Sequence, residues 1–176
     1  MKGTTILCIR KDNVVAMAGD GQVTLGDQVI KEGARKVRRL YDGKVLTGFA
    51  GGTADAMTLL ERFEKRLSEH SGNLVRSATE LVKDWRTDRV LRRLEAMMLV
   101  ADKNTTLLLS GAGDILEPEG QACAIGSGAG YALAAARSFL GSSGERADEI
   151  ARRSLIIASG ICIYTNDSIT LEVLED

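Results

Sequence analysis

The order of strand-like and helix-like segments constrains the fold of this chain more than any other feature of its sequence. Alternating runs rich in β-branched residues predict strands at residues 4–10, 14–18, 37–40, 44–50, 96–101, 105–109, 122–125 and 168–173. Helical spacing of apolar residues predicts two helices between the fourth and fifth of these strands, and two more at 131–140 and 147–158. Blocks of strands separated by pairs of helices differ from the strict alternation of a doubly wound parallel sheet.

The two central helices are expected to be neighbours. The first begins at Thr53, a residue type that caps helices, and ends at His70, while the second runs from Leu74 to Leu94. Two sheets packed face to face, with helices covering both outer faces, would use every predicted element. Since 176 residues are the size of one compact domain, the sequence predicts a single α+β domain of four layers.

Charge and apolar patterning argue against several classes of function. Lys and Arg number 23 against 24 Asp and Glu, so no overall field draws the chain to nucleic acid or to an anionic membrane surface. No run of apolar residues approaches the length that spans a membrane, and none follows Lys2 near the N-terminus. We therefore expect no nucleic-acid partner, no membrane partner and a cytoplasmic location.

The cysteines and the single histidine narrow the possible chemistry. Cys8, Cys123 and Cys162 lie far apart without CxxC spacing, so we expect reduced thiols rather than disulfides or a zinc site. His70, the one histidine, lies at the end of a predicted helix, where a surface or capping role is expected. Neither a histidine-based triad nor zinc-centred hydrolysis is supported, so a hydrolase of this sequence needs another base.

A threonine at a processed N-terminus provides such a base. Its hydroxyl is a weak nucleophile until a proton is removed, and the α-amine of the same residue, with an ordinary pKa of about 7.7 to 8.0, can accept that proton. Here Gly3 and Thr4 lead directly into a predicted strand, which would hold the hydroxyl rigidly. Taken alone, these residues are more simply read as the start of a strand, so Thr4 needs further support.

Ordered motifs along the chain give that support. They include GDGQ at 19–22 and GFAGGTAD at 48–55, and further segments lie at 4–6, 34–40, 83–89, 91–96, 124–128 and 161–166. Read together, they resemble the HslV (ClpQ) peptidases, bacterial relatives of proteasome β-subunits that work with the HslU ATPase. The resemblance covers essentially the whole chain from Thr4.

The resemblance implies a fold, a processing step and an activity. The fold is a four-layer αββα sandwich of the N-terminal nucleophile hydrolase type. The chain divides into a short propeptide, residues 1–3, and a single threonine-peptidase domain, residues 4–176. Autocatalytic cleavage after Gly3 would free the amine of the nucleophile, Thr4. The expected activity is that of an endopeptidase that degrades unfolded proteins.

Two charged residues are expected beside Thr4 on the same resemblance. Lys36 would lie near the hydroxyl, where its charge stabilises a developing alkoxide and disfavours protonation of the amine. Asp20 would keep Lys36 charged and oriented. Taken alone, Asp20 before a glycine is more simply a hairpin-turn residue, and Lys36 is more simply a solvated charge or part of a nucleic-acid patch in a basic run.

Two further positions carry expected catalytic roles. Gly48 aligns with the residue whose backbone N–H faces the tetrahedral intermediate, although a plain turn between a strand and a helix also explains a glycine there. Ser127 aligns with a serine that hydrogen-bonds the Thr4 amine or a shuttling water. The chain then departs from the family, because Ala129 and Gly130 stand where Gly-Pro is common, which can alter the start of the following helix.

No cofactor is expected for the chemistry, but a structural Na⁺ is. Relatives bind a monovalent cation through backbone carbonyls near the end of the C-terminal helix, and the matching positions are Ser159, Cys162 and Thr165. Ser159 replaces a usual glycine. Carbonyl oxygens ligate hard cations whatever side chain they accompany, so the site is expected to depend on the backbone angle at this residue.

The resemblance also implies partners. We expect two stacked hexameric rings of this chain, with the active sites facing an internal chamber. A hexameric AAA+ ATPase of the HslU type would unfold proteins, thread them into the chamber and reorganise the Thr4 site on docking. The sequence contains no GxxxxGK[ST] phosphate loop, so ATP would be hydrolysed by that other polypeptide.

Two other functions stay open at this point. The Gly-rich segment at 124–130 links a strand to a helix as in a nucleotide-binding module, but its spacing is GxGxG rather than GxGxxG. A catalytically silent ring subunit, with an assembly or binding role, would share all the packing motifs. The joint presence of Thr4, Asp20 and Lys36 argues against it, and the intact mass separates the two, because a silent subunit has no need to lose residues 1–3.

Overall fold

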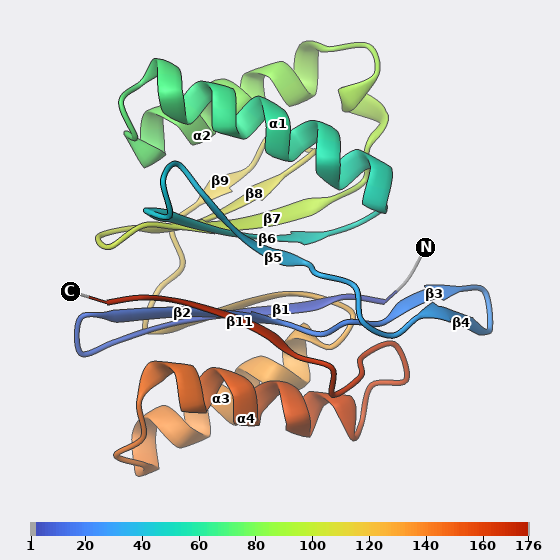
Figure 1. Ribbon diagram of the computed structural model, residues 1–176, viewed down its shortest axis with the longest axis vertical. Coiled ribbons are helices and arrows are strands. Elements are labelled where there is room, and N and C mark those ends of the chain that lie inside the picture. The colour runs from blue at the N-terminus through green and yellow to red at the C-terminus, as the bar shows by residue number, and fades with distance from the viewer. Residues whose placement is uncertain (1–2, 176) are drawn as a thin grey trace.

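The chain folds into two stacked β-sheets covered by helices on both outer faces. The structure is a computed structural model that describes residues 3–175. Its four helices are α1 (Thr53–Glu69), α2 (Leu74–Thr87), α3 (Ala129–Ser142) and α4 (Ala147–Ser159). Figure 1 shows α1 and α2 against one sheet, and α3 and α4 against the other. The predicted four-layer sandwich is confirmed.

Each sheet is antiparallel throughout. One has the order β10-β1-β2-β11 and consists of β10 (Ala122–Gly126), β1 (Thr5–Lys11), β2 (Val14–Gly19) and β11 (Thr170–Leu174). The other runs in sequence order and consists of β5 (Val37–Leu40), β6 (Val45–Ala50), β7 (Met97–Ala101), β8 (Thr106–Ser110) and β9 (Ile115–Leu116). Strand β1 therefore has a partner on both sides, which fixes the backbone that leads from Thr4.

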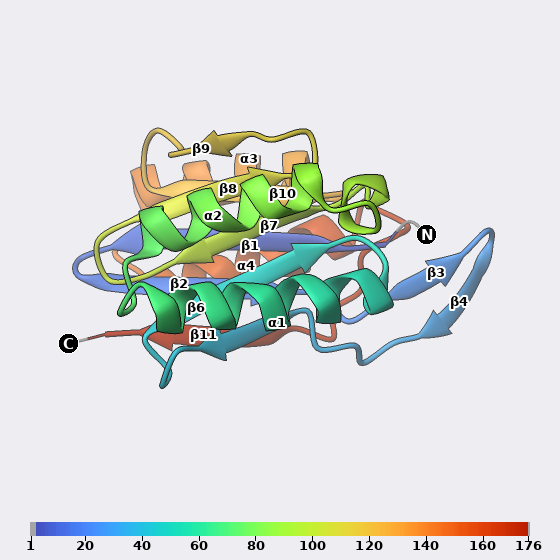
Figure 2. The ribbon, with the colours of Figure 1, turned by 90° about the horizontal axis from the view of Figure 1, so that it is seen from above.

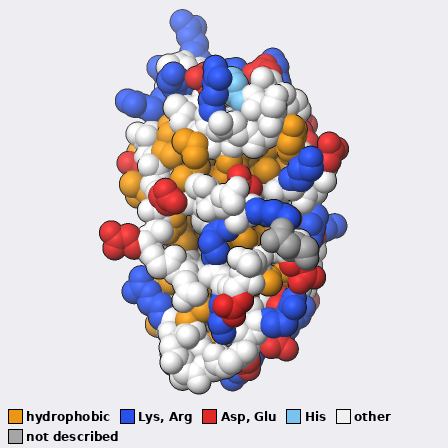
Figure 3. All heavy atoms as spheres, turned by 90° about the vertical axis from the view of Figure 1, so that its left-hand side faces the viewer, with side chains coloured by type: hydrophobic (Ala, Val, Ile, Leu, Met, Phe, Trp, Pro, Cys, Tyr) orange, Lys and Arg blue, Asp and Glu red, His pale blue; other side chains and the backbone are white. Residues whose placement is uncertain are grey.

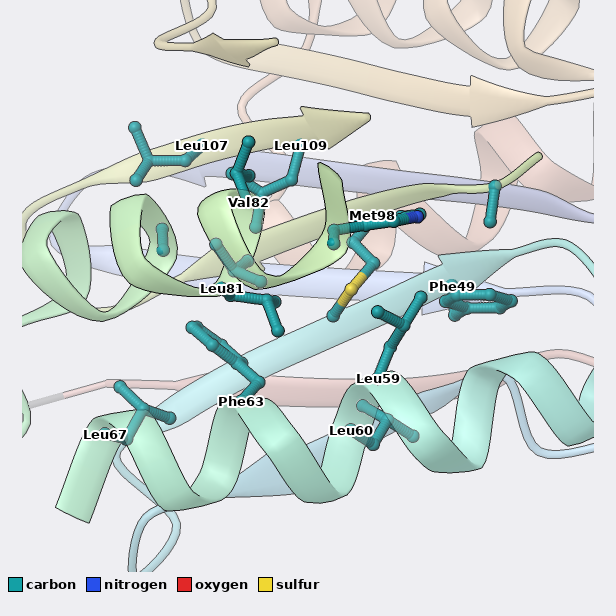
Figure 4. Close-up of a cluster of buried hydrophobic side chains, with 14 of the residues drawn as sticks. Phe49, Leu59, Leu60, Phe63, Leu67, Leu81, Val82, Met98, Leu107 and Leu109 are labelled. Atoms are coloured by element: carbon teal, nitrogen blue, oxygen red, sulfur yellow. The ribbon is translucent and has the colours of Figure 1, made fainter. Parts of the chain in front are cut away.

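The two helix layers pack on their sheets with side chains of different size. Trp85 and Phe63 are fully buried under α1 and α2, and Figure 4 shows Phe63 of α1 pointing toward Leu81 of α2. The core beneath α3 and α4 is rich in alanine, contributed by Ala132, Ala136, Ala147, Ala151 and Ala158. Large side chains fill the first layer, while small ones bring α3 and α4 close to their sheet.

The structure corrects one helix boundary and one capping residue that the sequence predicted. The pattern predicted a second helix as far as Leu94, but α2 ends at Thr87. The Asp88 carboxylate accepts the backbone N–H groups of Val90 and Leu91, at 2.8 and 3.1 Å, and so begins a separate 3-10 turn. At the other helix, Gly52 occupies the N-cap position, and no side chain caps it.

A two-stranded hairpin lies outside the four layers and was not predicted. It consists of β3 (Val23–Leu25) and β4 (Gln28–Lys31), and Figure 2 shows it extending beyond the two sheets. Every residue of β4 is exposed, so this strand lacks the alternation that marks a half-buried strand. The short strand β9 was also missed.

The opposite end of the sandwich carries charges of both signs. Figure 3 looks at that end and shows basic and acidic side chains interspersed around small apolar areas. This distribution agrees with the nearly equal numbers of basic and acidic residues. Among residues 3–175, no helix combines the length and the apolar character needed to cross a bilayer.

Candidate active site

Thr4 lies immediately before β1 and is held by contacts on both sides. Its side chain and backbone are only 7% exposed, and its carbonyl accepts the backbone N–H of Ser127 at 2.8 Å. The next backbone N–H, from Thr5, donates to Asp20 Oδ1 at 2.8 Å. The Thr5 hydroxyl accepts the N–H of Gly128 at 2.9 Å. Two separate loops therefore fix the backbone around Thr4.

The glycines of the 126–128 motif allow this close approach. A Cβ atom at Gly126, whose φ is +97°, would lie 2.0 Å from the Thr4 carbonyl oxygen. At Gly128, a Cβ atom would lie 2.4 Å from the Thr5 hydroxyl. No L side chain fits either place without moving the strand. The Gly-rich segment is therefore used to pack against the chain beside Thr4, which accounts for its composition without a bound phosphate.

Asp20 and Lys36 form a buried ion pair beside Thr4. Lys36 Nζ lies 2.9 Å from Asp20 Oδ1, and the two side chains are 8% and 0% exposed. The other carboxylate oxygen of Asp20 accepts the backbone N–H groups of Gln22 and Asn166, at 3.0 and 3.3 Å. The carboxylate is thus fully enclosed by donors, as a buried negative charge requires. Asp20 is not a hairpin-turn residue.

The surroundings of Lys36 act on its charge in opposite directions. Burial lowers the pKa of Lys36 from its ordinary value, and the negative charge and hydrogen bond of Asp20 counter that effect in part. The ammonium also donates to the Gln22 carbonyl at 2.5 Å and to the Gly3 carbonyl at 2.9 Å. Lys36 is therefore not the solvated charge that its basic neighbours indicate.

Gly3 brings the predicted cleavage site into this cluster. Of the three predicted propeptide residues, Met1 and Lys2 lie outside the described part of the chain. The Gly3 carbonyl oxygen accepts hydrogen bonds from Lys36 Nζ and from the Thr4 hydroxyl. The carbonyl of the Gly3–Thr4 bond thus lies between the predicted nucleophile and a positive charge.

A cleft of about 960 Å³ opens in front of Thr4. Its walls come from the β3 and β5 side, from the chain that follows β6, and from the loop that leads into β7. They include Thr4, Lys36, Ala50, Gly51, Met97 and Ser127. An extended peptide could lie in this cleft, because it joins the hydroxyl of Thr4 to open solvent along apolar and basic walls.

Gly48 is not among the residues that line this cleft. It lies inside β6, paired with Val37 of β5 and Leu99 of β7, so it does not form a turn between a strand and a helix. A Cβ atom there would lie 2.4 Å from Ile6, which explains the glycine by the packing of one sheet on the other. Gly51, which follows β6, lines the cleft instead.

Ser127 lies beside Thr4, as the resemblance implied, but the contact that the structure records is through its backbone. Its N–H donates to the Thr4 carbonyl, and the residue is exposed in the cleft. The predicted bond to a free amine stays a prediction.

Two residues of this site had no assigned role in the sequence interpretation. The side chain of Asn166 accepts the N–H of Gly21 at 2.9 Å and donates to the backbone carbonyl of Glu32 at 2.8 Å. Gln22 donates its side-chain amide to the carbonyl of Ile163 at 2.8 Å. The motif at 19–22 contained Gln22, but nothing in the local pattern linked either residue to segments more than 130 positions away.

The three positions proposed for the cation lie at and after the end of α4. Ser159 is the last residue of that helix, so serine is not strained where relatives have glycine. The carbonyl of Cys162 accepts the N–H of Thr165 at 3.1 Å, which leaves one lone pair of that oxygen for a ligand. These residues are thus compatible with a carbonyl-ligated Na⁺.

In the described part of the chain, the cysteines and acidic residues form neither a reactive thiol site nor a metal site that could replace Thr4. All three cysteines are free thiols, and burial raises the pKa of Cys8 to about 12, so this thiol stays protonated near neutral pH. Among residues 3–175, no group of three His, Cys, Asp or Glu side chains is arranged to hold a metal ion. Thr4, by contrast, lines the cleft and lies beside the buried ion pair of Asp20 and Lys36.

Comparisons with known proteins agree with this fold. The sequence model of the family described as "Proteasome subunit" matches residues 1–174. The crystal structure of a eukaryotic HslV from Trypanosoma brucei is similar with a TM-score of 0.92 and 46% identity, over 98% of this chain and 99% of that one. Two structures of BPH from Thiobacillus denitrificans share the fold, with TM-scores of 0.76 and 0.74 at 18% and 17% identity. They cover 97% of this chain, and 98% and 97% of theirs.

Proposed function

Because this chain belongs to the proteasome subunit family and is a threonine peptidase of the HslV type, we propose that Thr4 is its nucleophile and the free Thr4 amine its base. The observation that carries the proposal is the position of Thr4, at the base of an open cleft and beside a lysine held by a buried carboxylate. Lys36 and Asp20 are the proposed supporting residues.

The proposed chemistry divides peptide hydrolysis into two steps. The Thr4 amine takes the hydroxyl proton while Oγ1 attacks the scissile carbonyl carbon, and the Lys36 ammonium stabilises the negative charge near Oγ1. The amine then returns the proton to the leaving nitrogen, which breaks the peptide bond and leaves an ester on Thr4. Water, activated by the same amine, hydrolyses the ester and restores the hydroxyl.

Two neighbours are proposed to assist these steps. A backbone N–H beside the cleft would stabilise the oxyanion of the intermediate, and Gly51 suits this role better than Gly48, because Gly51 lines the cleft. Ser127 would hydrogen-bond the amine or the water that carries its proton. Its backbone bond to Thr4 supports this assignment by keeping the serine beside the nucleophile.

We propose that the same hydroxyl releases residues 1–3. Attack of Thr4 Oγ1 on the Gly3 carbonyl carbon transfers the propeptide from nitrogen to oxygen, and water then cleaves the ester. The products are a carboxylate on Gly3 and a free amine on Thr4. The proposal is supported by the bonds from Lys36 Nζ and from the Thr4 hydroxyl to the Gly3 carbonyl oxygen, which would favour charge on that oxygen.

The remaining expectations concern assembly and partners. We propose that this chain forms two stacked hexameric rings in the cytoplasm, and that an HslU-type AAA+ ATPase delivers unfolded proteins and activates the site allosterically. A Na⁺ ion held by the carbonyls of Ser159, Cys162 and Thr165 would stabilise the loop after α4, which contributes Asn166 to the Asp20 site. It would take no part in the chemistry.

Substitution at Thr4 tests the proposed function. Peptide hydrolysis would be measured for wild type, Thr4→Ala and Thr4→Ser, together with the oligomeric state of each. We expect Thr4→Ala to assemble but to have no activity, and Thr4→Ser to keep part of it, since a hydroxyl and an amine are both retained. Normal peptide cleavage by Thr4→Ala would overturn the assignment. A parallel assay with the ATPase and nucleotide tests activation, and equal rates would contradict it.

A further inference from the structure

Lys36 has three hydrogen bonds, and two of them go to residues outside the proposed catalytic set, Gly3 and Gln22. Its ammonium donates to Asp20 Oδ1, to the Gly3 carbonyl and to the Gln22 carbonyl. Removal of residues 1–3 takes away the Gly3 carbonyl. Asp20 and the Gln22 carbonyl are then the acceptors that direct the third N–H of the ammonium toward Thr4.

The carbonyl of Gln22 is held from both sides. On one side, its own backbone N–H donates to Asp20 Oδ2 at 3.0 Å. On the other side, its side-chain amide donates to the Ile163 carbonyl at 2.8 Å and to the Thr24 hydroxyl at 3.0 Å. Gln22 is 7% exposed, so these bonds are shielded from water, which makes them stiff and costly to break.

We propose that the side chain of Gln22 is a positioning element of the active site, which fixes the Lys36 ammonium by anchoring the Gln22 carbonyl to the loop after α4. This inference rests on the proposed function, because it assigns a role to Gln22 through Lys36. Gln22 itself does not touch the reacting atoms. Its contribution is to keep the carbonyl, and hence the charge, within reach of the Thr4 hydroxyl.

The anchor connects the site to two exposed parts of the molecule. Thr24 belongs to the hairpin β3–β4 that extends beyond the sheets (Figure 2). The carbonyl of Ile163 belongs to the loop between α4 and β11, where the Ile163 side chain is 79% exposed. A displacement of either segment would therefore be transmitted to the Gln22 carbonyl and from there to Lys36.

Loss of the anchor has a consequence that a packing defect does not. The charged groups that face the Lys36 ammonium are the Asp20 carboxylate and, after processing, the Thr4 amine. A carbonyl oxygen stabilises the ammonium more than it stabilises the neutral amine, so displacement of the Gln22 carbonyl favours the neutral form of Lys36. Activity that needs the ammonium would then be lost at a lower pH than in wild type.

Two substitutions and one control test the inference. Gln22→Met has nearly the size of glutamine and removes both amide bonds, and Gln22→Ala removes the whole side chain. Gln28→Ala is the matched control, because Gln28 lies in the same hairpin and is exposed. For each, the oligomeric state, kcat, KM and the pH dependence of kcat would be measured on one peptide substrate, with Lys36→Ala alongside.

We expect kcat of both Gln22 variants to fall by about 10- to 100-fold, as for a displaced catalytic group. KM should stay within about twofold, and the alkaline limb of the kcat profile should move to lower pH, with Gln28→Ala unchanged. A wild-type kcat, or an equal loss at every pH with an unmoved limb, in the assembled Gln22→Met protein would overturn the inference. If Lys36→Ala were itself active, the proposed function would fail instead.

Discussion

A buried ion pair and an exposed ion-pair cluster from one basic segment show how burial, rather than distance, decides the role of a charge. Lys36 and Asp20 lie 2.9 Å apart with side chains 8% and 0% exposed. Arg35 and Arg39 approach Glu172 more closely, both at 2.6 Å, but their side chains are 62% and 40% exposed. Water screens the second cluster and leaves it little net energy. The buried pair is screened much less by water, and under the proposed function its charge acts on Thr4.

The comparison predicts the largest loss for Asp20→Asn. This change leaves the Lys36 ammonium buried without a carboxylate, and its new amide group faces the N–H groups that Asp20 accepted. The free energy of unfolding should fall by about 3 to 5 kcal/mol, and kcat by at least about 100-fold. Denaturant unfolding and peptide hydrolysis measure the two effects. A stable, active Asp20→Asn protein would remove the distinction between the two pairs.

Lys36→Met is expected to be as inactive as Asp20→Asn, but to lose less free energy of unfolding. The Asp20 carboxylate keeps its backbone donors Thr5, Gln22 and Asn166, so the loss should be about 1 to 3 kcal/mol. Lys65→Met, at a lysine side chain that is 76% exposed, is the control and should leave kcat unchanged. If Lys36→Met proved less stable than Asp20→Asn, the backbone donors would not be compensating the carboxylate as described.

The buried lysine also predicts opposite responses of activity and stability to pH. Its folded pKa is lowered by burial against the opposing charge of Asp20. Between that value and about 10.4, the unfolded chain binds more protons than the folded chain, so this group's contribution to stability rises with pH. The proposed activity falls over the same range as the ammonium is lost. The free energies of unfolding of wild type and Lys36→Met would be measured as a function of pH, together with the pH profile of kcat for wild type. If the stability of wild type relative to Lys36→Met fell as pH rose, the prediction would be contradicted.

Glu172→Gln should have the smallest effect. Burial alone would raise the pKa of Glu172, but the hydrogen bonds and charges of Arg39 and Arg35 outweigh it and lower the pKa. Its contribution to stability is therefore present above the ordinary glutamate value and is lost as pH falls through the lower folded value. Near neutral pH the substitution should cost at most about 1 kcal/mol and leave kcat unchanged. A difference that persists in about 1 M salt would mean that the cluster is not screened.

Burial also separates the features that sequence analysis could predict from those that it could not. Alternation and helical spacing predicted the layers, because each strand and helix buries one face. The hairpin at Val23–Lys31 buries neither face of its second strand, so no pattern marked it. The charge run at 35–39 gave no sign that only Lys36 turns inward. The family resemblance supplied that expectation, while the roles of Gln22 and Asn166 depend on contacts between distant segments and emerged only from the structure.

The account as a whole depends on a free amine at Thr4, and the mass of the active protein tests this most directly. Purified, active protein would be treated with a threonine-directed covalent inhibitor, and its intact mass and N-terminal sequence would be determined. We predict a chain that begins at Thr4 and carries the inhibitor on that residue, with activity lost in proportion to labelling. Active protein that begins at Met1 and stays unlabelled at Thr4 would contradict the account.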